Sequence, residues 1–226
     1  MHCMKTLPIL AVAALASVVL AAGGIKITPK FEKDQKTKWK TELKMSVGDN
    51  EALLAGTIIG VTKSADGDAI KLSYDWENGK AIVGGEEIGV PFAPTDVTVN
   101  KAGELQEVSG GIQGTDPVRT FLILFAHLPQ AEIEKDGTWK ATYPASTKME
   151  LAERKIEGTY QGEEEVSGKK AHKFNVKMVE GDFKTDTTYW ATEDGRVLKV
   201  KSEFDGLPVP IAGASAKGTI TADYTE

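Results

Sequence analysis

Cysteine is almost absent from this chain of 226 residues, which contains one cysteine and three histidines. Cys3 lies in an N-terminal segment that we expect to be removed, so the mature protein has no disulfide bonds to stabilise its fold. It does not need them, because roughly 200 residues can bury a substantial single core. The mature chain keeps only His127 and His172, and no residue spacing supplies the three or four ligands of a zinc site. We expect both histidines to be structural.

Motifs of the common enzyme classes are missing as well. The chain has no Gly-x-Ser-x-Gly elbow and no glycine-rich phosphate loop. Its 27 basic and 33 acidic residues are interspersed. No basic stripe and no aromatic-basic platform of the kind that binds nucleic acid stands out. We therefore expect a protein that is not an enzyme, holds no cofactor or metal and does not bind nucleic acid.

The N-terminus carries the clearest signal. Met4-Lys5 is followed by an uncharged run over residues 7–22 that ends in small residues, which is the layout of a secretory signal peptide. A transmembrane anchor is the alternative, but it needs about 18 continuous apolar residues, and this run falls short and ends in Ala-Ala-Gly-Gly. We expect cleavage after Ala21 or Ala22, so that residues 1–22 direct export from a bacterial cell to the periplasm or the medium. The mature product would not be an integral membrane protein.

Past residue 36, apolar and polar residues alternate with a period of two. Trp39 to Val47 shows this pattern, as do residues 70–76 and 172–178. Alternation of this kind is typical of antiparallel strands with one buried and one solvated face. Glycine-containing dipeptides that favour hairpin turns separate the strands: Asp66-Gly67, Asn78-Gly79, Asp136-Gly137, Ser167-Gly168 and Asp194-Gly195. We expect a loose leader over residues 23–36 and a single β-rich domain over residues 37–226.

One segment breaks the alternation. Asp116 and Pro117 fit the N-cap and first position of a helix, and Pro129 closes the segment. The apolar residues between them follow helical spacing and predict a helix over residues 117–128, which would be buried because it is apolar all round. A strand over residues 121–125 is the alternative. The helix would separate two β-rich halves, 37–110 and 147–205, whose strand-turn-strand patterns resemble each other.

These elements predict a mainly β fold: a curved antiparallel sheet or half-barrel with one main helix packed on its concave face. The candidate functional surface is apolar, because nothing else in the sequence suggests chemistry. In one interpretation the helix simply fills the core. In the other it covers a cavity for a lipid or acyl chain, where each buried methylene contributes about 0.8 kcal/mol. The candidate ligand-binding residues come from the helix and from an apolar loop at 207–211: Phe121, Leu122, Leu124, Phe125, Leu128, Leu207, Val209 and Ile211.

The layout of signal peptide, curved sheet and apolar helix between two β-rich halves resembles the LolA/LolB-like lipoprotein-carrier group. A shorter segment, Phe125-Ala126-His127-Leu128-Pro129 followed by Asp136-Gly137-Thr138-Trp139, looks like one in uncharacterised bacterial exported β-proteins. The carrier resemblance implies that half-barrel and helix hold acyl chains. The expected function is therefore non-enzymatic binding of a lipid or other apolar ligand between sheet and helix. The alternative is an envelope protein-interaction or structural module with a filled core.

Overall fold

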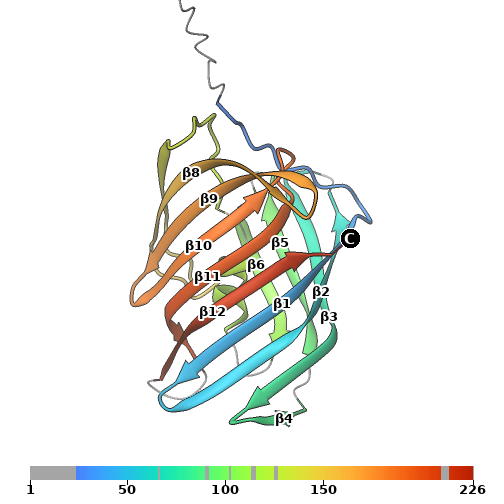
Figure 1. Ribbon diagram of the computed structural model, residues 1–226, viewed down its shortest axis with the longest axis vertical. Helices are drawn as coiled ribbons and strands as arrows, with labels where there is room; N and C mark the ends of the chain where they lie inside the picture. Colours follow the sequence, from blue (N-terminus) through green and yellow to red (C-terminus); the bar gives the residue numbers. More distant parts are fainter. Residues whose placement is uncertain are drawn as a thin grey trace, which may run out of the picture.

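The computed structural model describes residues 24–65, 67–89, 92–101, 103–112, 116–124, 127–209 and 214–225 (Figure 1). The expected signal peptide, Phe125 and Ile211 therefore lie outside the described residues. The described part of the chain forms one curved antiparallel sheet and one helix. The elements are β1 (Lys36–Val47), β2 (Asn50–Ser64), β3 (Ala69–Val83), β4 (Glu86–Ile88), β5 (Phe92–Asn100), β6 (Leu105–Ile112), α1 (Pro117–Leu124), β7 (Thr138–Tyr143), β8 (Arg154–Val166), β9 (Lys169–Glu180), β10 (Phe183–Ala191), β11 (Val197–Pro208) and β12 (Ser215–Tyr224).

The strand order shows how the two halves of the chain meet. It runs β6-β5-β3-β2-β1-β12-β11-β10-β9-β8-β7, with β4 paired to β3 outside this path. Each half is thus a meander, and the pairing of β1 with β12 joins the two into one continuous sheet. The sheet is not closed, because β6 and β7 are its two edges. The sequence prediction of a mainly β, curved antiparallel sheet is confirmed.

Alternation along the strands builds the core on the concave face. On β9, Phe174, Val176 and Met178 are at most 1% exposed, whereas Lys177 between them is exposed and pairs with an acidic residue of the next strand. The hydrophobic core extends in this way through strands of both halves and includes α1. One face of every long strand is therefore committed to the interior, as the period of two predicts.

Glycine turns lie mostly where the sequence predicts them, with one correction. Ser167 and Gly168 both have positive φ in the β8–β9 hairpin, and Gly195 has φ +77° between β10 and β11. Asn78-Gly79 is not a hairpin turn: it lies inside β3, opposite a register shift in β2. Asn78 takes a positive φ of 55° there, which indicates a β-bulge that lets the strand continue.

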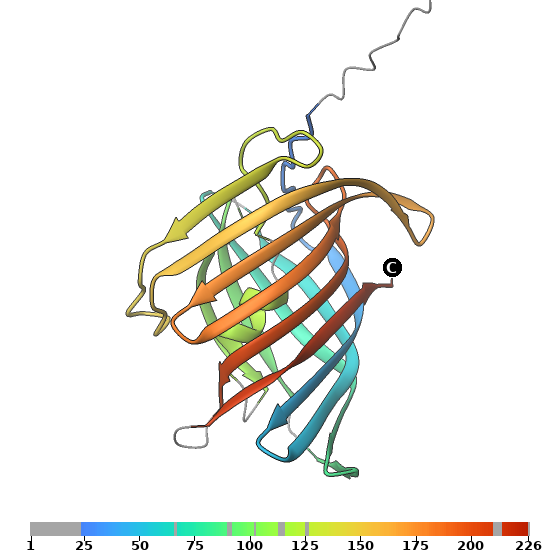
Figure 2. The ribbon, with the colours of Figure 1, turned by 60° about the vertical axis from the view of Figure 1, so that its left-hand side comes forward.

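Helix α1 lies on the concave face between the two halves, as Figure 2 shows. Asp116 caps it, because its Oδ1 accepts a hydrogen bond from the Arg119 N–H at 2.9 Å. The helix ends at Leu124, so Leu128 of the predicted 117–128 helix is not helical. On the side of β10, the Tyr189 hydroxyl donates to the Ile123 carbonyl oxygen at 2.9 Å. This bond fixes the buried side of the helix to the sheet.

Candidate ligand-binding cavity

Residues 25–35, here called the strap, cross one end of the half-barrel before β1 begins. The sequence suggested a loose leader, but in the structure the strap is bonded to three separate parts of the fold. These backbone bonds join Ile25 with Ile133 (2.8 and 2.9 Å), Thr28 with Glu193 (2.9 Å), Lys30 with Asp194 (3.0 Å), Asp34 with Thr62 (2.8 Å) and Thr62 with Gln35 (3.0 Å). The strap therefore ties the connection before β7, the β10–β11 turn and β2 together.

The strap, the helix and the sheet enclose a cavity of about 170 Å³. Its deeper walls come from strands on both sides of the β1–β12 pairing and from α1. Its outer rim comes from the strap, the β10–β11 turn and the segment after the helix. The apolar side chains that line it are Ile27, Pro29, Phe31, Trp39, Ile58, Leu72, Tyr74, Phe121, Leu124, Leu128, Pro129, Val197, Val200 and Ala222.

A row of aromatic rings crosses this cavity. Trp39 lies 6.2 Å from Tyr74, and Tyr74 lies 5.0 Å from Phe121, measured between ring centroids. The Trp39 indole N–H donates to the Val197 carbonyl oxygen at 3.0 Å, which holds the ring in place. Burial raises the pKa of Tyr74, so this side chain stays neutral at physiological pH. The row supplies flat, uncharged walls suited to an apolar ligand.

Three of the residues proposed from the sequence line the cavity: Phe121, Leu124 and Leu128. Leu122 and Leu207 are each 1% exposed and belong to the hydrophobic core instead. Val209 is partly buried against the same core, and Phe125 and Ile211 are outside the described residues.

The segment that was expected to form an apolar loop at 207–211 begins inside β11, which extends to Pro208. Leu207 is ten residues along β11 from Val197 of the cavity, a distance of about 33 Å at the usual strand rise. The structure therefore does not bring Leu207 to the cavity that the helix lines.

Sequence reasoning missed the strap and the two β-strand aromatics, Trp39 and Tyr74. Ile27 is 4% exposed, and with Ile25 and Phe31 it gives the strap three apolar side chains at spacings of two and four. That pattern was the only signal in a segment that otherwise reads as polar.

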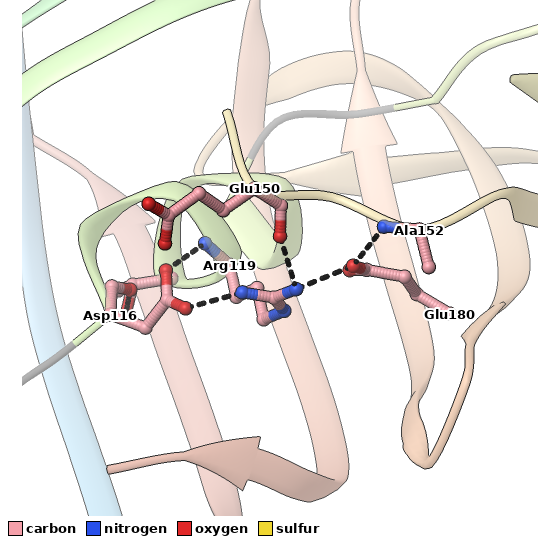
Figure 3. A network of polar contacts seen from close by, with 6 residues as sticks. Asp116, Arg119, Glu150, Ala152 and Glu180 are labelled. Atoms are coloured by element: carbon pink, nitrogen blue, oxygen red, sulfur yellow. Dashed lines mark hydrogen bonds and ion pairs between the residues drawn. The ribbon is translucent and has the colours of Figure 1, made fainter. Parts of the chain in front are cut away.

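A buried polar network fixes α1 to the opposite part of the sheet (Figure 3). The Arg119 guanidinium pairs with Asp116 at 2.6 Å and with Glu180 at 2.5 Å, and it donates to the Glu150 carbonyl oxygen at 3.0 Å. The same Glu180 oxygen accepts the Ala152 N–H at 2.9 Å. Burial alone would lower the pKa of Arg119, but its bonds to the two carboxylates outweigh burial and raise it. The helix is thus held by a charged pair that has little contact with water.

The only buried side-chain polar atoms without a hydrogen bond in the described part of the chain are Nε2 of His127, Nε of Arg154 and Oε2 of Glu180. Electrostatic coupling links Arg154 to both of the other two residues. Burial, with the nearby Arg154 charge, lowers the pKa of His127 to about 4. His127 is therefore neutral at pH 7.

His172 lies on the buried face of β9, 2% exposed, and its Nδ1 is hydrogen-bonded to the Tyr160 hydroxyl at 2.9 Å. Burial lowers its pKa as well. Within the residues that the structure describes, no group of three or more histidine, cysteine or acidic side chains is placed to hold a metal ion. No helix of the same residues has the length and apolar character needed to cross a membrane.

Fold and cavity together define the class: an open antiparallel sheet, curved around one helix, with an apolar cavity at one end. No protein-family model matches the chain, and no curated protein matches it either. Among solved structures, it is similar to a DUF1329 family protein from Desulfovibrio piger ATCC 29098, with 9% sequence identity and a TM-score of 0.24. That match covers 86% of this chain and 85% of the other.

Proposed function

We propose that this protein is an exported, non-enzymatic binder that takes an apolar ligand, or the apolar part of an envelope lipid, into the cavity between sheet and helix. The observation that carries the proposal is the cavity itself, whose deep walls are mostly apolar side chains from both halves, with the uncharged Thr41 and Thr62 among them. Sites for small apolar molecules have this composition. The apolar run over residues 7–22 supports export to the periplasm or medium.

The size of the cavity limits the ligand. About 170 Å³ is only slightly larger than the engineered cavity of about 150 Å³ that binds benzene, and below the range of about 300–1,000 Å³ for drug-sized ligands. In this conformation the site accommodates a ring or a short chain. A longer acyl chain, or a probe with several rings, extends past the open rim of the cavity or moves the strap or α1 outward.

The test uses a pair of variants on neighbouring residues of β12. Ala222 lines the cavity, whereas Asp223 is exposed. Ala222→Leu should fill part of the cavity and weaken binding of a neutral fluorescent probe, N-phenylnaphthylamine, while Asp223→Leu should leave binding unchanged. Lipid extraction and mass spectrometry of protein purified without detergent should in addition find a bound apolar molecule. Absence of both probe uptake and extracted lipid would refute the proposal.

A second candidate function, an envelope interaction module with a filled core, has an observation in its favour. Phe121, Leu122 and Ile123 are all buried, at 7%, 1% and 1% exposure, so the helix is largely core rather than a loose cover. Such a module would pair with a partner through β6 or β7, the edges of the sheet. Self-association or capture of a defined envelope protein, with no ligand in the cavity, would favour it.

A further inference from the structure

The rim of the cavity is more polar than its floor. This difference narrows the class of ligand that fits the cavity, and the inference drawn from it rests on the proposed function. Most deep lining residues are apolar and nearly inaccessible, such as Leu72 and Val200 at 6% and 2% exposure, and the buried polar ones, Thr41 and Thr62, carry no charge. At the rim, the lining residues are polar and more exposed: Lys30, Gln35, Gln130, Asp194 and Arg196. A ligand that satisfies both regions is amphiphilic, with its polar end at the strap.

The charges of the rim do not cancel. The Arg196 guanidinium lies 3.5 Å from Asp194, and both side chains are partly exposed. Burial would raise the pKa of Asp194, but a hydrogen bond from Thr192 and the charge of Arg196 lower it, so the carboxylate stays ionised and balances Arg196. Lys30 has no ion-pair partner among the residues that the structure describes. One positive charge therefore remains at the rim of a chain whose formal net charge is −6.

Lys30 is also held in position by its backbone. Its N–H donates to the Asp194 carbonyl oxygen at 3.0 Å, so the strap and the turn that carries Arg196 are joined at this residue. The turn packs tightly there, because a side chain at Gly195 would lie 2.8 Å from the Cα of Pro29. The two cationic residues of the rim thus come from two segments that support each other.

We propose that the cavity selects a single-chain amphiphile with an anionic head group, a carboxylate, sulfate or phosphate. The tail lies against the aromatic row, and the head group lies between Lys30 and Arg196. The chemistry is charge-assisted hydrogen bonding from Lys30, whose charge no described residue balances, with Arg196, already paired with Asp194, as a further donor at a partly solvated rim. Because the rim is exposed, the preference over a neutral head group should be about three- to fivefold and should fall as salt is added.

The experiment compares ligands that share one chain and differ in head group. Octanoate, octanol and octyltrimethylammonium compete with N-phenylnaphthylamine for the full mature protein. Octanoate should compete best and octyltrimethylammonium worst. Lys30→Gln should remove the advantage of octanoate and leave octanol unchanged. Lys26→Gln is the matched control, because Lys26 is an exposed strap lysine that does not line the cavity.

The outcomes separate the inference from the proposed function. Equal competition by octanoate and octanol, or an effect of Lys26→Gln as large as that of Lys30→Gln, overturns the selection of anionic head groups while the cavity still binds. Failure of the fluorescent probe to bind, together with the absence of any extracted lipid, overturns the proposed function, and the head-group selection is refuted with it. The inference is supported if Lys30→Gln, but not Lys26→Gln, removes the advantage of octanoate and if added salt reduces that advantage in the unmodified protein.

Discussion

Removing the Arg119 guanidinium tests whether a buried ion pair holds the helix in the half-barrel. In Arg119→Met, Glu180 keeps the Ala152 N–H as a partner but loses the charge 2.5 Å away. Glu180 is 4% exposed, so water cannot replace the lost partner. Breaking a buried pair in this way typically costs about 3–5 kcal/mol of unfolding free energy. For a domain of this size, that corresponds to a fall in Tm of about 6–20 °C.

A surface ion pair with the same contact distance tests whether burial, rather than distance, sets the effect on stability. Lys140 and Glu157 also lie 2.5 Å apart, but their side chains are 76% and 63% exposed. Lys140→Met should therefore change Tm little, although the contact distance is the same. The double variant Arg119→Met/Glu180→Met removes both charges of the pair, but it also takes the Glu180 charge away from the buried Arg154, so it should recover only part of the loss.

The assay is thermal unfolding followed by circular dichroism, with urea unfolding at one temperature to obtain the free energy. Equal melting temperatures for Arg119→Met and Lys140→Met would refute the reasoning. So would a double variant less stable than either single variant, since that would mean that the pair acts through packing rather than charge.

Three further predictions concern pH, packing and access to the cavity. The pKa of His127 is about 4 in the fold and about 6.5 when unfolded, so the unfolded chain binds more protons between these two pH values. The free energy of unfolding should therefore fall by about 3 kcal/mol as pH drops through this window. Urea unfolding of His127→Asn over the same pH range should show a smaller loss. A Cβ at Gly158 would lie 2.1 Å from Cζ2 of Trp139, so Gly158→Ala should destabilise the protein by about 1–3 kcal/mol through overpacking; unchanged unfolding curves would contradict this. Ile25 and Ile133 form a mutually hydrogen-bonded antiparallel pair, whose Cα spacing of about 5.5 Å suits a disulfide. Oxidised Ile25→Cys/Ile133→Cys should take up the apolar probe more slowly than after reduction, and equal rates would show that ligands do not pass the strap.

Local sequence patterns predicted most of the strands, because a strand with one buried face must alternate. They could not place Asn78-Gly79, since positive φ suits a hairpin turn and a bulge equally well. The partner strand decides between them: Gly56 lies opposite, and a side chain there would come within 2.9 Å of the Cα of Gly79. That constraint comes from pairing, which a single strand does not encode.

The candidate site was predicted only in part for a similar reason. Phe121, Leu124 and Leu128 belong to the apolar segment that stood out, and they do line the cavity. Leu207 looked equally suitable, but the length of β11 carries it to the far end of the sheet. Ile27 lies in a short, mostly polar segment and becomes part of a wall only because the curved sheet brings β2 and the β10–β11 turn to either side of it.

The pairing of β1 with β12 has a consequence for the order of folding. Within each half, neighbouring strands are close in sequence and can form early, because closing short loops costs little conformational entropy. The central pair joins Trp39 to Tyr224 and Met45 to Gly218, so it cannot form until the last strand has been synthesised. Two half-sheets with exposed apolar faces must therefore exist before this step. Slow folding and a need for protection from aggregation at this stage follow from the topology.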